Sequence, residues 1–156
     1  GSTVVWLTDT FALVGIIRND DGSWSAPQLI KQYGSDPSLD VLQLSADGTR
    51  VMWVRDDSAG ILTSTRSGAS WAPVSNVTVD ETYSAALAPN GLVAAWANSD
   101  GEMLVSKWNG VKWPKPKLLG TVGSSPSIAL TNKTLAFTSS GYRGSSLRSA
   151  IWKKGK

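Results

Sequence analysis

The sequence predicts an all-β fold, a β-propeller-type array of four-stranded antiparallel blades. Two sets of aromatic residues recur at intervals of 41 to 47 residues. The segments between them are short, largely apolar and separated by Asn-Gly, Asp-Gly and Ser-Gly pairs, which favour tight hairpins. Because no segment keeps a helical apolar period over about ten residues, almost no helix is expected.

The repeat is clearest in the two aromatic sets. Members of the first set are separated by 47, 43 and 41 residues, and members of the second by 47 and 42. Periods of roughly 40 to 50 residues with several short strands per unit are typical of propeller blades. The first set is Trp6, Trp53, Trp96 and Phe137, and the second is Trp24, Trp71 and Trp113.

The most complete unit contains four strands in order. They are expected at 83–88 (YSAALA), 92–97 (LVAAWA), 102–108 (EMLVSKW) and 111–119 (VKWPKPKLL). The turns contain Asn90-Gly91, Asp100-Gly101 and Asn109-Gly110, pairs that tolerate the positive φ angles of a two-residue hairpin. The preceding unit repeats this order at 38–45, 49–55, 61–66 and 70–77.

Proline marks the last strand of each of the first three units, at Pro27, Pro73, Pro114 and Pro116. Proline has no N–H to donate to a β-ladder, so these strands are expected at the outer edge of each blade. The first and second strands are rich in small apolar residues. This composition suits inner strands that neighbouring blades cover on both faces.

The units are expected at about 3–34, 35–80, 81–122 and 123–156 of one domain. The first begins at its second strand and the last stops at its third, which gives fourteen expected strands. Gly1 and Ser2 are expected to be a cloning scar. The blades close into a four-bladed ring, form a fragment of a larger propeller, or share a ring with a second chain. A β-trefoil, which needs three units, is the second choice of fold.

The composition limits the classes of function. The chain has neither Cys nor His, which removes thiol nucleophiles, imidazole bases, disulfides and Cys/His zinc sites. The net charge of +3 does not indicate a nucleic-acid surface, and no run of about 18 apolar residues indicates membrane insertion. The acidic turns lack the spacing of a calcium-binding loop. We expect no cofactor and no metal site.

The aromatic residues have different expected roles. The first set recurs among apolar neighbours and is expected to pack between blades. The second set, Trp24, Trp71 and Trp113, is expected to pin the outer strand to the third strand of the same blade, with a sugar- or peptide-stacking platform as the alternative. A third position repeats in place but not in type: Arg18, Arg66, Trp108 and Trp152 follow the first-set aromatic by 12, 13, 12 and 15 residues.

A core position does not accept Arg and Trp interchangeably, so this third position is expected to be at least partly exposed. Both residue types are favoured at binding surfaces. The alternative is a solvated rim, where an Arg stem or an indole covers strand surface.

The segments GSWSAPQLI, ASWAPVSNV and VKWPKPKLL resemble repeats of BNR or sialidase-like propellers and of propeller lectins. The run from Trp108 to Trp113 (WNGVKW) is similar to the lectin element Trp-x-Gly-x-x-Trp, and LSADGTRVMWVRDD is similar to a strand of TolB-like propellers. The lectin resemblance implies glycan sites between neighbouring blades, where Trp stacks on a sugar and Arg donates to its hydroxyls. It assigns these roles to Arg66, Trp108 and Trp152, with Trp71 and Trp113 as neighbours.

We therefore expect a non-catalytic, lectin-like carbohydrate-binding module that is extracellular, at the cell surface or periplasmic. The alternative is a propeller fragment that acts as an assembly scaffold, either as a homo-oligomer such as a dimer that completes a propeller or beside the blades of a parent protein. A sialidase-like glycosidase fragment ranks third, because most acidic residues lie in or beside turns. The expected ligand-binding residues are Arg18, Arg66, Trp71, Trp108, Trp113 and Trp152.

Overall fold

A computed structural model describes residues 2–55, 60–123, 126–141 and 144–151, which contain fifteen strands and no helix. Every pair of neighbouring strands is antiparallel. The strands form four sheets, which we call blades 1 to 4. The all-β, propeller-type prediction is confirmed. The described residues contain no helix that is long and apolar enough to cross a membrane.

Each blade is built from consecutive strands. Blade 1 contains β1 (Thr3–Leu7), β2 (Ala12–Ile17) and β3 (Gln28–Gln32). Blade 2 contains β4 (Leu39–Leu44), β5 (Arg50–Arg55), β6 (Ile61–Ser67), β7 (Ser70–Trp71) and β8 (Ser75–Thr78). Blade 3 contains β9 (Thr82–Leu87), β10 (Val93–Asn98), β11 (Glu102–Lys107) and β12 (Lys117–Thr121). Blade 4 contains β13 (Ile128–Leu130), β14 (Thr134–Gly141) and β15 (Gly144–Ile151).

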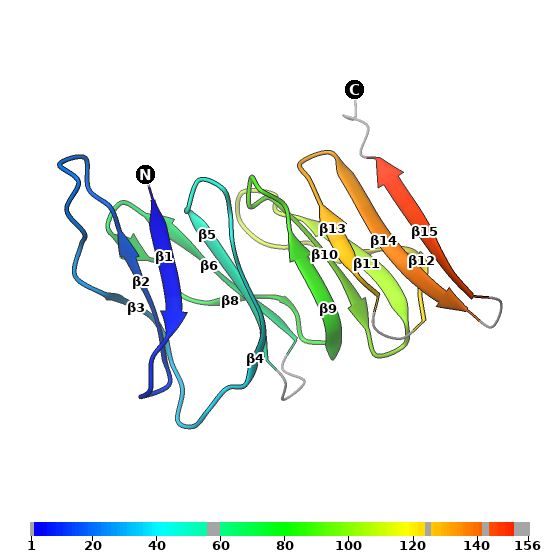
Figure 1. Ribbon diagram of the computed structural model, residues 1–156, viewed down its shortest axis with the longest axis horizontal. Helices are drawn as coiled ribbons and strands as arrows, with labels where there is room; N and C mark the ends of the chain where they lie inside the picture. The colour runs from blue at the N-terminus through cyan, green and yellow to red at the C-terminus, as the bar shows by residue number, and fades with distance from the viewer. Residues whose placement is uncertain (1, 56–59, 124–125, 142–143, 152–156) are drawn as a thin grey trace.

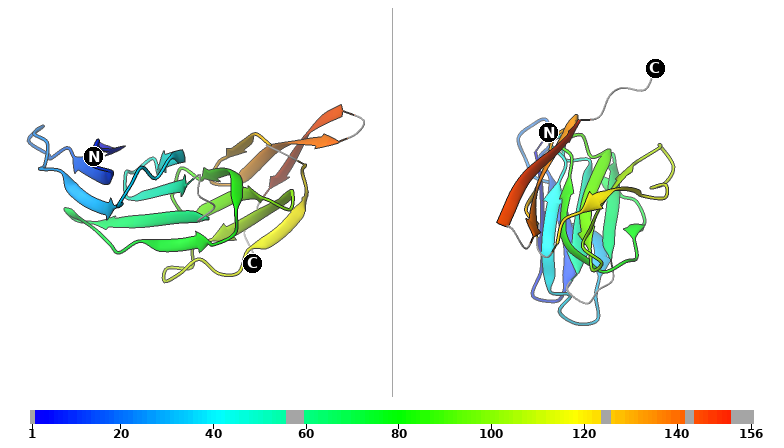
Figure 2. Two further views of the ribbon diagram at one scale, coloured as in Figure 1. Left: turned by 90° about the horizontal axis from the view of Figure 1, so that it is seen from below. Right: turned by 90° about the vertical axis from the view of Figure 1, so that its right-hand side faces the viewer.

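The blades follow one another along the molecule in chain order (Figure 1). The strands β4, β9 and β13, each the first of its blade, are neighbours in space. Figure 2 shows a curved row with blade 1 at one end and blade 4 at the other. The four blades therefore do not close on one another, and the alternative of a four-bladed ring is wrong for this structure.

The hydrophobic core lies between the blades, in three separate clusters. Each cluster receives a first-set aromatic from the later blade, which packs against the blade before it. Trp53 and Trp96 are fully buried between blades 1 and 2 and between blades 2 and 3, and Phe137 is buried between blades 3 and 4. The packing role predicted for these three residues is confirmed. Trp6, on blade 1, is only half-buried.

Two turn glycines connect hairpin chemistry with blade packing. Gly48 and Gly91 both have a φ of 68°, as the predicted tight turns require. Gly48 lies against Thr3, the first residue of β1, and Gly91 lies against Arg50, the first residue of β5, each in the preceding blade. A Cβ atom on Gly48 would clash with Thr3, and one on Gly91 would lie 3.1 Å from Cβ of Arg50. Only glycine fits both the turn and this close approach.

The outer strands are shorter than predicted. The strand expected at 70–77 is split into β7 and β8, so the described residues contain fifteen strands instead of the fourteen expected. The strand expected at 111–119 begins only at Lys117. The physical reason is proline: Pro73, Pro114 and Pro116 lie in the segments that leave the ladder. The hydroxyls of Ser64 and Ser106 bridge the gaps by donating to Ala72 O and Pro114 O, at 2.7 and 2.9 Å.

Candidate functional site

Strand pairing shows which positions are equivalent in the blades. Trp6, Trp53, Trp96 and Phe137 lie opposite Val14, Leu62, Leu104 and Arg148. The position that alternates between Arg and Trp follows this partner by four residues in every blade. Arg18 is exposed and Arg66 and Trp108 are half-buried, so the expected partial exposure holds for these three. Trp152 lies outside the described residues.

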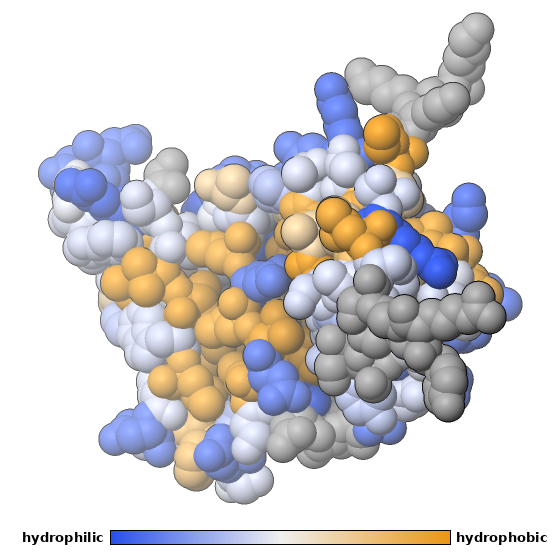
Figure 3. Space-filling model, turned by 45° about the vertical axis from the view of Figure 1, so that its right-hand side comes forward, coloured by the Kyte–Doolittle hydropathy of each residue, from blue (hydrophilic) through white to orange (hydrophobic). Residues whose placement is uncertain are grey.

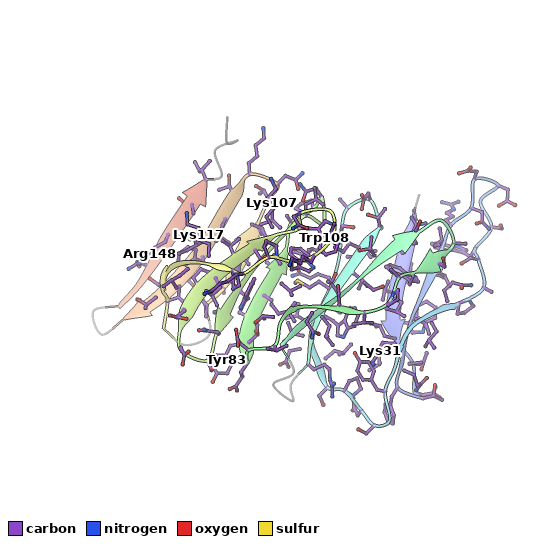
Figure 4. All side chains as sticks on the ribbon, turned by 180° about the vertical axis from the view of Figure 1, so that it is seen from behind. Lys31, Tyr83, Lys107, Trp108, Lys117 and Arg148 are labelled. Carbon is purple, nitrogen blue, oxygen red and sulfur yellow. The ribbon has the colours of Figure 1, made fainter. Side chains whose placement is uncertain are left out.

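The most unusual cluster lies where blade 3 meets blade 2. Arg50, the first residue of β5, places the Cζ atom of its guanidinium 4.3 Å from the ring centroid of Trp108 and 5.3 Å from that of Trp113. The two indole rings meet edge to face, with centroids 5.6 Å apart. Figure 4 shows Trp108 in the middle of the molecule, beside blade 2. We call Arg50, Trp108 and Trp113 the Arg50 junction.

The Arg50 junction contains buried donors without acceptors. Arg50 is only 5% exposed, and its Nη1 atom has no hydrogen-bond partner among the described residues. The Nε1 atom of Trp113 is also buried without a partner in that part of the chain. Burying an unpaired cation is costly, and the two cation–π contacts offset only part of that cost. The indole N–H groups of Trp71 and Trp96 are likewise buried without a partner among the described residues, so the unpaired guanidinium of Arg50 is what distinguishes this junction. Native proteins rarely leave a buried cationic donor unpaired, which makes the junction a candidate site for a ligand whose acceptor atoms would have to open it, because the donor atoms are closed to solvent in this structure.

Burial lowers the pKa of Arg50, and the negative charge of Asp47 acts in the opposite direction. The β4–β5 turn holds both groups. Ser45 Oγ accepts a 2.9 Å hydrogen bond from the backbone N–H of Arg50 and donates one of 2.7 Å to Asp47 Oδ1. The N–H and hydroxyl of Thr49 donate to the same carboxylate oxygen, at 3.0 and 2.8 Å. The turn therefore fixes the backbone from which Arg50 enters the junction.

This turn predicts a pH dependence of stability. Although burial raises the pKa of Asp47, the hydrogen bonds from Ser45 and Thr49 outweigh it and hold the pKa below its ordinary value of 3.8. A lowered folded-state pKa stabilises the fold above the unfolded-state value, and this contribution is lost as the pH falls through the folded-state value. We expect the urea midpoint of the wild type to fall more steeply below about pH 4 than that of Asp47→Asn. Equal slopes for the two proteins would contradict this assignment.

The junction of blades 1 and 2 has the same parts with the arginine on the other side. Thr3 occupies the place of Arg50, Arg66 that of Trp108, and Trp71 that of Trp113. Arg66 is satisfied, since Nε donates to Gly48 O at 3.3 Å and Nη1 to Gly68 O at 2.8 Å. In each of these two junctions, one blade supplies the arginine. At the first junction the arginine comes from the later blade, and at the second it comes from the earlier one.

The predicted site residues therefore fall into separate places. Trp108 and Trp113 meet at the Arg50 junction, while Arg66 and Trp71 belong to the junction of blades 1 and 2. Arg18 lies on an exposed hairpin, where its Nε donates to Gly22 O at 3.4 Å. The prediction that the second-set Trp residues hold the outer segment to the third strand of the same blade agrees with the structure: Trp24 pairs with Arg18, Trp71 pairs with Arg66, and Trp113 meets Trp108 edge to face. Trp71 and Trp113 also pack into the core shared with the preceding blade. Trp71 fits there because Gly15 of blade 1 has no side chain. A Cβ atom added at Gly15 would lie only 3.0 Å from the Nε1 atom of Trp71.

Sequence reasoning missed Arg50 as a site residue. A signal was present, since the equivalent positions in the other blades are Thr3, Val93 and Thr134, and only Arg50 brings a charge to the start of the second strand. A charged residue at an inner, covered strand needs a partner. That criterion selects Arg50 without knowledge of the fold.

A groove lies on blade 3, at the start of β11, whereas the Arg50 junction lies at the end of that strand. This groove of about 460 Å³ is lined mainly by acceptors, with Lys115 as a cation. The acidic residues that line it are Asp80, Glu81, Asp100 and Glu102. Among the described residues, no acidic group has the arrangement needed to hold a metal ion. The groove therefore offers mainly hydrogen-bond acceptors, whereas the Arg50 junction contains unpaired donors.

No protein-family model and no curated protein matches the chain. In a crystal structure of a nidogen/laminin complex, a chain 13% identical to this one aligns with 96% of this chain and 58% of its own length, with a TM-score of 0.57. Two further structures score too low to carry an argument. The structure of human WBSCR16 is 14% identical, aligns with 86% of this chain and 42% of its own length, and has a TM-score of 0.49. The structure of a Lactobacillus plantarum protein is 10% identical, aligns with 96% of this chain and 53% of its own length, and has a TM-score of 0.44. The chain spans less than two thirds of each of these structures. The first similarity supports the propeller fold and nothing more.

Proposed function

We propose that this protein is a non-catalytic ligand-binding module that binds a carbohydrate at the Arg50 junction. One observation carries the proposal: a buried guanidinium with an unpaired Nη1 packs against two indoles, one of which has an unpaired N–H in the described part of the chain. An acceptor group that reaches these donors would remove the penalty of leaving them unpaired. The half-buried ring of Trp108 supplies the flat apolar surface that sugar rings prefer.

The chemistry of the junction favours an acidic sugar. A guanidinium binds a carboxylate through two parallel, charge-assisted hydrogen bonds, which are stronger than those to a neutral hydroxyl. Uronates and sialates present a carboxylate beside an apolar ring face. We therefore expect glycans with such a sugar to bind more tightly than their neutral counterparts.

The groups at the junction suit binding rather than catalysis. Guanidinium and indole N–H groups donate hydrogen bonds, and neither accepts a proton nor attacks a carbon atom at neutral pH. A glycosidase needs two carboxyl groups on either side of the scissile bond. The acidic residues that gather on blade 3 line the other groove instead.

A glycan array with neutral, uronate-terminated and sialate-terminated glycans tests the proposal. Positive glycans are then titrated while tryptophan fluorescence is recorded, because a sugar on Trp108 changes the surroundings of an indole. Trp108→Ala is expected to weaken binding by about tenfold or more. Trp24→Ala, which removes a more exposed indole on blade 1, is the matched control and is expected to bind as the wild type does.

Two results would count against this function. One is the absence of binding to every glycan class, with fluorescence unchanged. The other is wild-type affinity in Trp108→Ala, provided that its near-ultraviolet circular dichroism shows an intact fold, because the sugar would then bind elsewhere.

A further inference from the structure

One face of blade 1 has no neighbouring blade among the described residues. Alternate residues of a strand point to opposite faces, and Val5 and Leu7 pack toward blade 2. Their neighbours Val4 and Trp6 therefore point away from it. Strand pairing extends this outer face through Ile16 and Val14 to Leu29, which is 59% exposed. We call the surface formed by Val4, Trp6, Ile16 and Leu29 the Trp6 face; Val14 lies on the same side of the sheet but is only 8% exposed.

Elsewhere in the chain, equivalent residues are covered by a preceding blade. Trp53 and Trp96 correspond to Trp6, and both are fully buried. Trp113 of blade 3 is buried against blade 2, whereas the equivalent Trp24 of blade 1 is 46% exposed. The Trp6 face thus has the composition of one half of a blade–blade interface, without the other half.

The opposite end of the molecule carries the complementary half. In blade 4, Leu135 and Phe137 pack toward blade 3, so Leu147 and Ile151 of β15 point away from it. Leu147 is 77% exposed, although the equivalent residues of the other blades, Leu13, Ile61 and Met103, are all fully buried. Figure 3, in which this end comes forward, shows apolar side chains at the surface. We call the surface around Leu147 and Ile151 the Leu147 face.

We infer that the Trp6 face of one copy of this chain packs on the Leu147 face of a second copy. The two faces are the halves of an interface that the chain already forms three times, in the same order, between its own blades. A second copy therefore continues an established stack. Exposed apolar faces of this kind are rare on isolated proteins because association buries them.

Such an interface is head to tail, because the two faces differ. Copies joined in this way form a closed ring if the rotation from one copy to the next adds up to a full turn. Otherwise they form an open filament. Two copies contribute eight blades, the upper end of the roughly four to eight that propellers contain. A ring of two copies leaves neither face exposed, so we expect a dimer.

Light scattering after gel filtration, over a series of concentrations, measures the predicted mass. The wild type is expected to be a dimer. Leu147→Glu and Leu29→Glu each place a charge on one face, and each is expected to raise the dissociation constant by at least about tenfold. Val111→Glu, at an equally exposed position in the loop between β11 and β12, is the control and is expected to remain dimeric.

A mixture of the two variants identifies the head-to-tail arrangement. Leu147→Glu retains an intact Trp6 face and Leu29→Glu an intact Leu147 face, so the mixture is expected to form a mixed dimer that neither variant forms with itself. A wild type that is monomeric at every concentration overturns the inference. A dimer that survives in either single variant, or a mixture without dimers, also overturns it.

Discussion

Replacing Trp96 with Ala is expected to lower the free energy of unfolding by about 3–5 kcal/mol. Trp96 is fully buried between blades 2 and 3, in a cluster with residues of both. Removing the indole takes away its apolar burial and leaves a cavity that relaxes only in part. Because each blade pair has its own small cluster, no larger core compensates for the loss.

This loss is large compared with the stability of a typical domain, about 5–15 kcal/mol. Urea unfolding followed by circular dichroism measures it as a shift of the midpoint. Tyr83→Ala is the control: truncating an aromatic side chain on β9 that is 52% exposed is expected to cost less than about 1 kcal/mol. Equal losses in the two variants would show that the blade interfaces do not stabilise the fold as described.

The blades were predictable because their signals are local. A turn pair such as Asp47-Gly48 specifies a hairpin within a few residues of the chain. Trp53 and Trp96 recur at a nearly constant interval, which reveals the repeat without knowledge of the fold. The outer strands were less predictable. Proline was recognised as an edge residue, but whether Pro73 interrupts a strand or merely lies on its free edge depends on which N–H groups face the neighbouring strand.

The Arg50 junction was only half predictable. Trp108 and Trp113 share a hairpin, so their spacing brings them to notice together. Arg50 lies 58 residues before Trp108 and belongs to another blade. Its contact with the indoles arises from the packing of one blade on the next, which no local pattern encodes. The repeated position showed Arg or Trp, but not which side chain of the neighbouring blade lies against it.

Replacing Arg50 with Met is expected to have opposite effects on stability and binding. Met is similar in length, flexible and apolar, so it fills the space between the indoles without a charge. The change removes a buried cation whose Nη1 has no acceptor in the described part of the chain, and it gives up two cation–π contacts worth roughly 0.5–2 kcal/mol each. Replacing poorly compensated buried charges with apolar side chains often stabilises a protein by about 1–4 kcal/mol.

Glycan binding, by contrast, is expected to be lost in Arg50→Met, because the guanidinium is the donor offered to the ligand. A residue that costs stability and supports binding is characteristic of a functional site. Arg66→Met is the matched control. Since the guanidinium of Arg66 already donates to two backbone carbonyls, its removal is expected to lower stability.

The most direct test of the Arg50 junction as a binding site is the free energy of unfolding of Arg50→Met, measured beside the wild type by urea denaturation without ligand. The predicted result is a variant more stable than the wild type by about 1 kcal/mol or more. A variant less stable by a similar amount would contradict the account, because Arg50 would then hold the blades together by itself and would need no ligand.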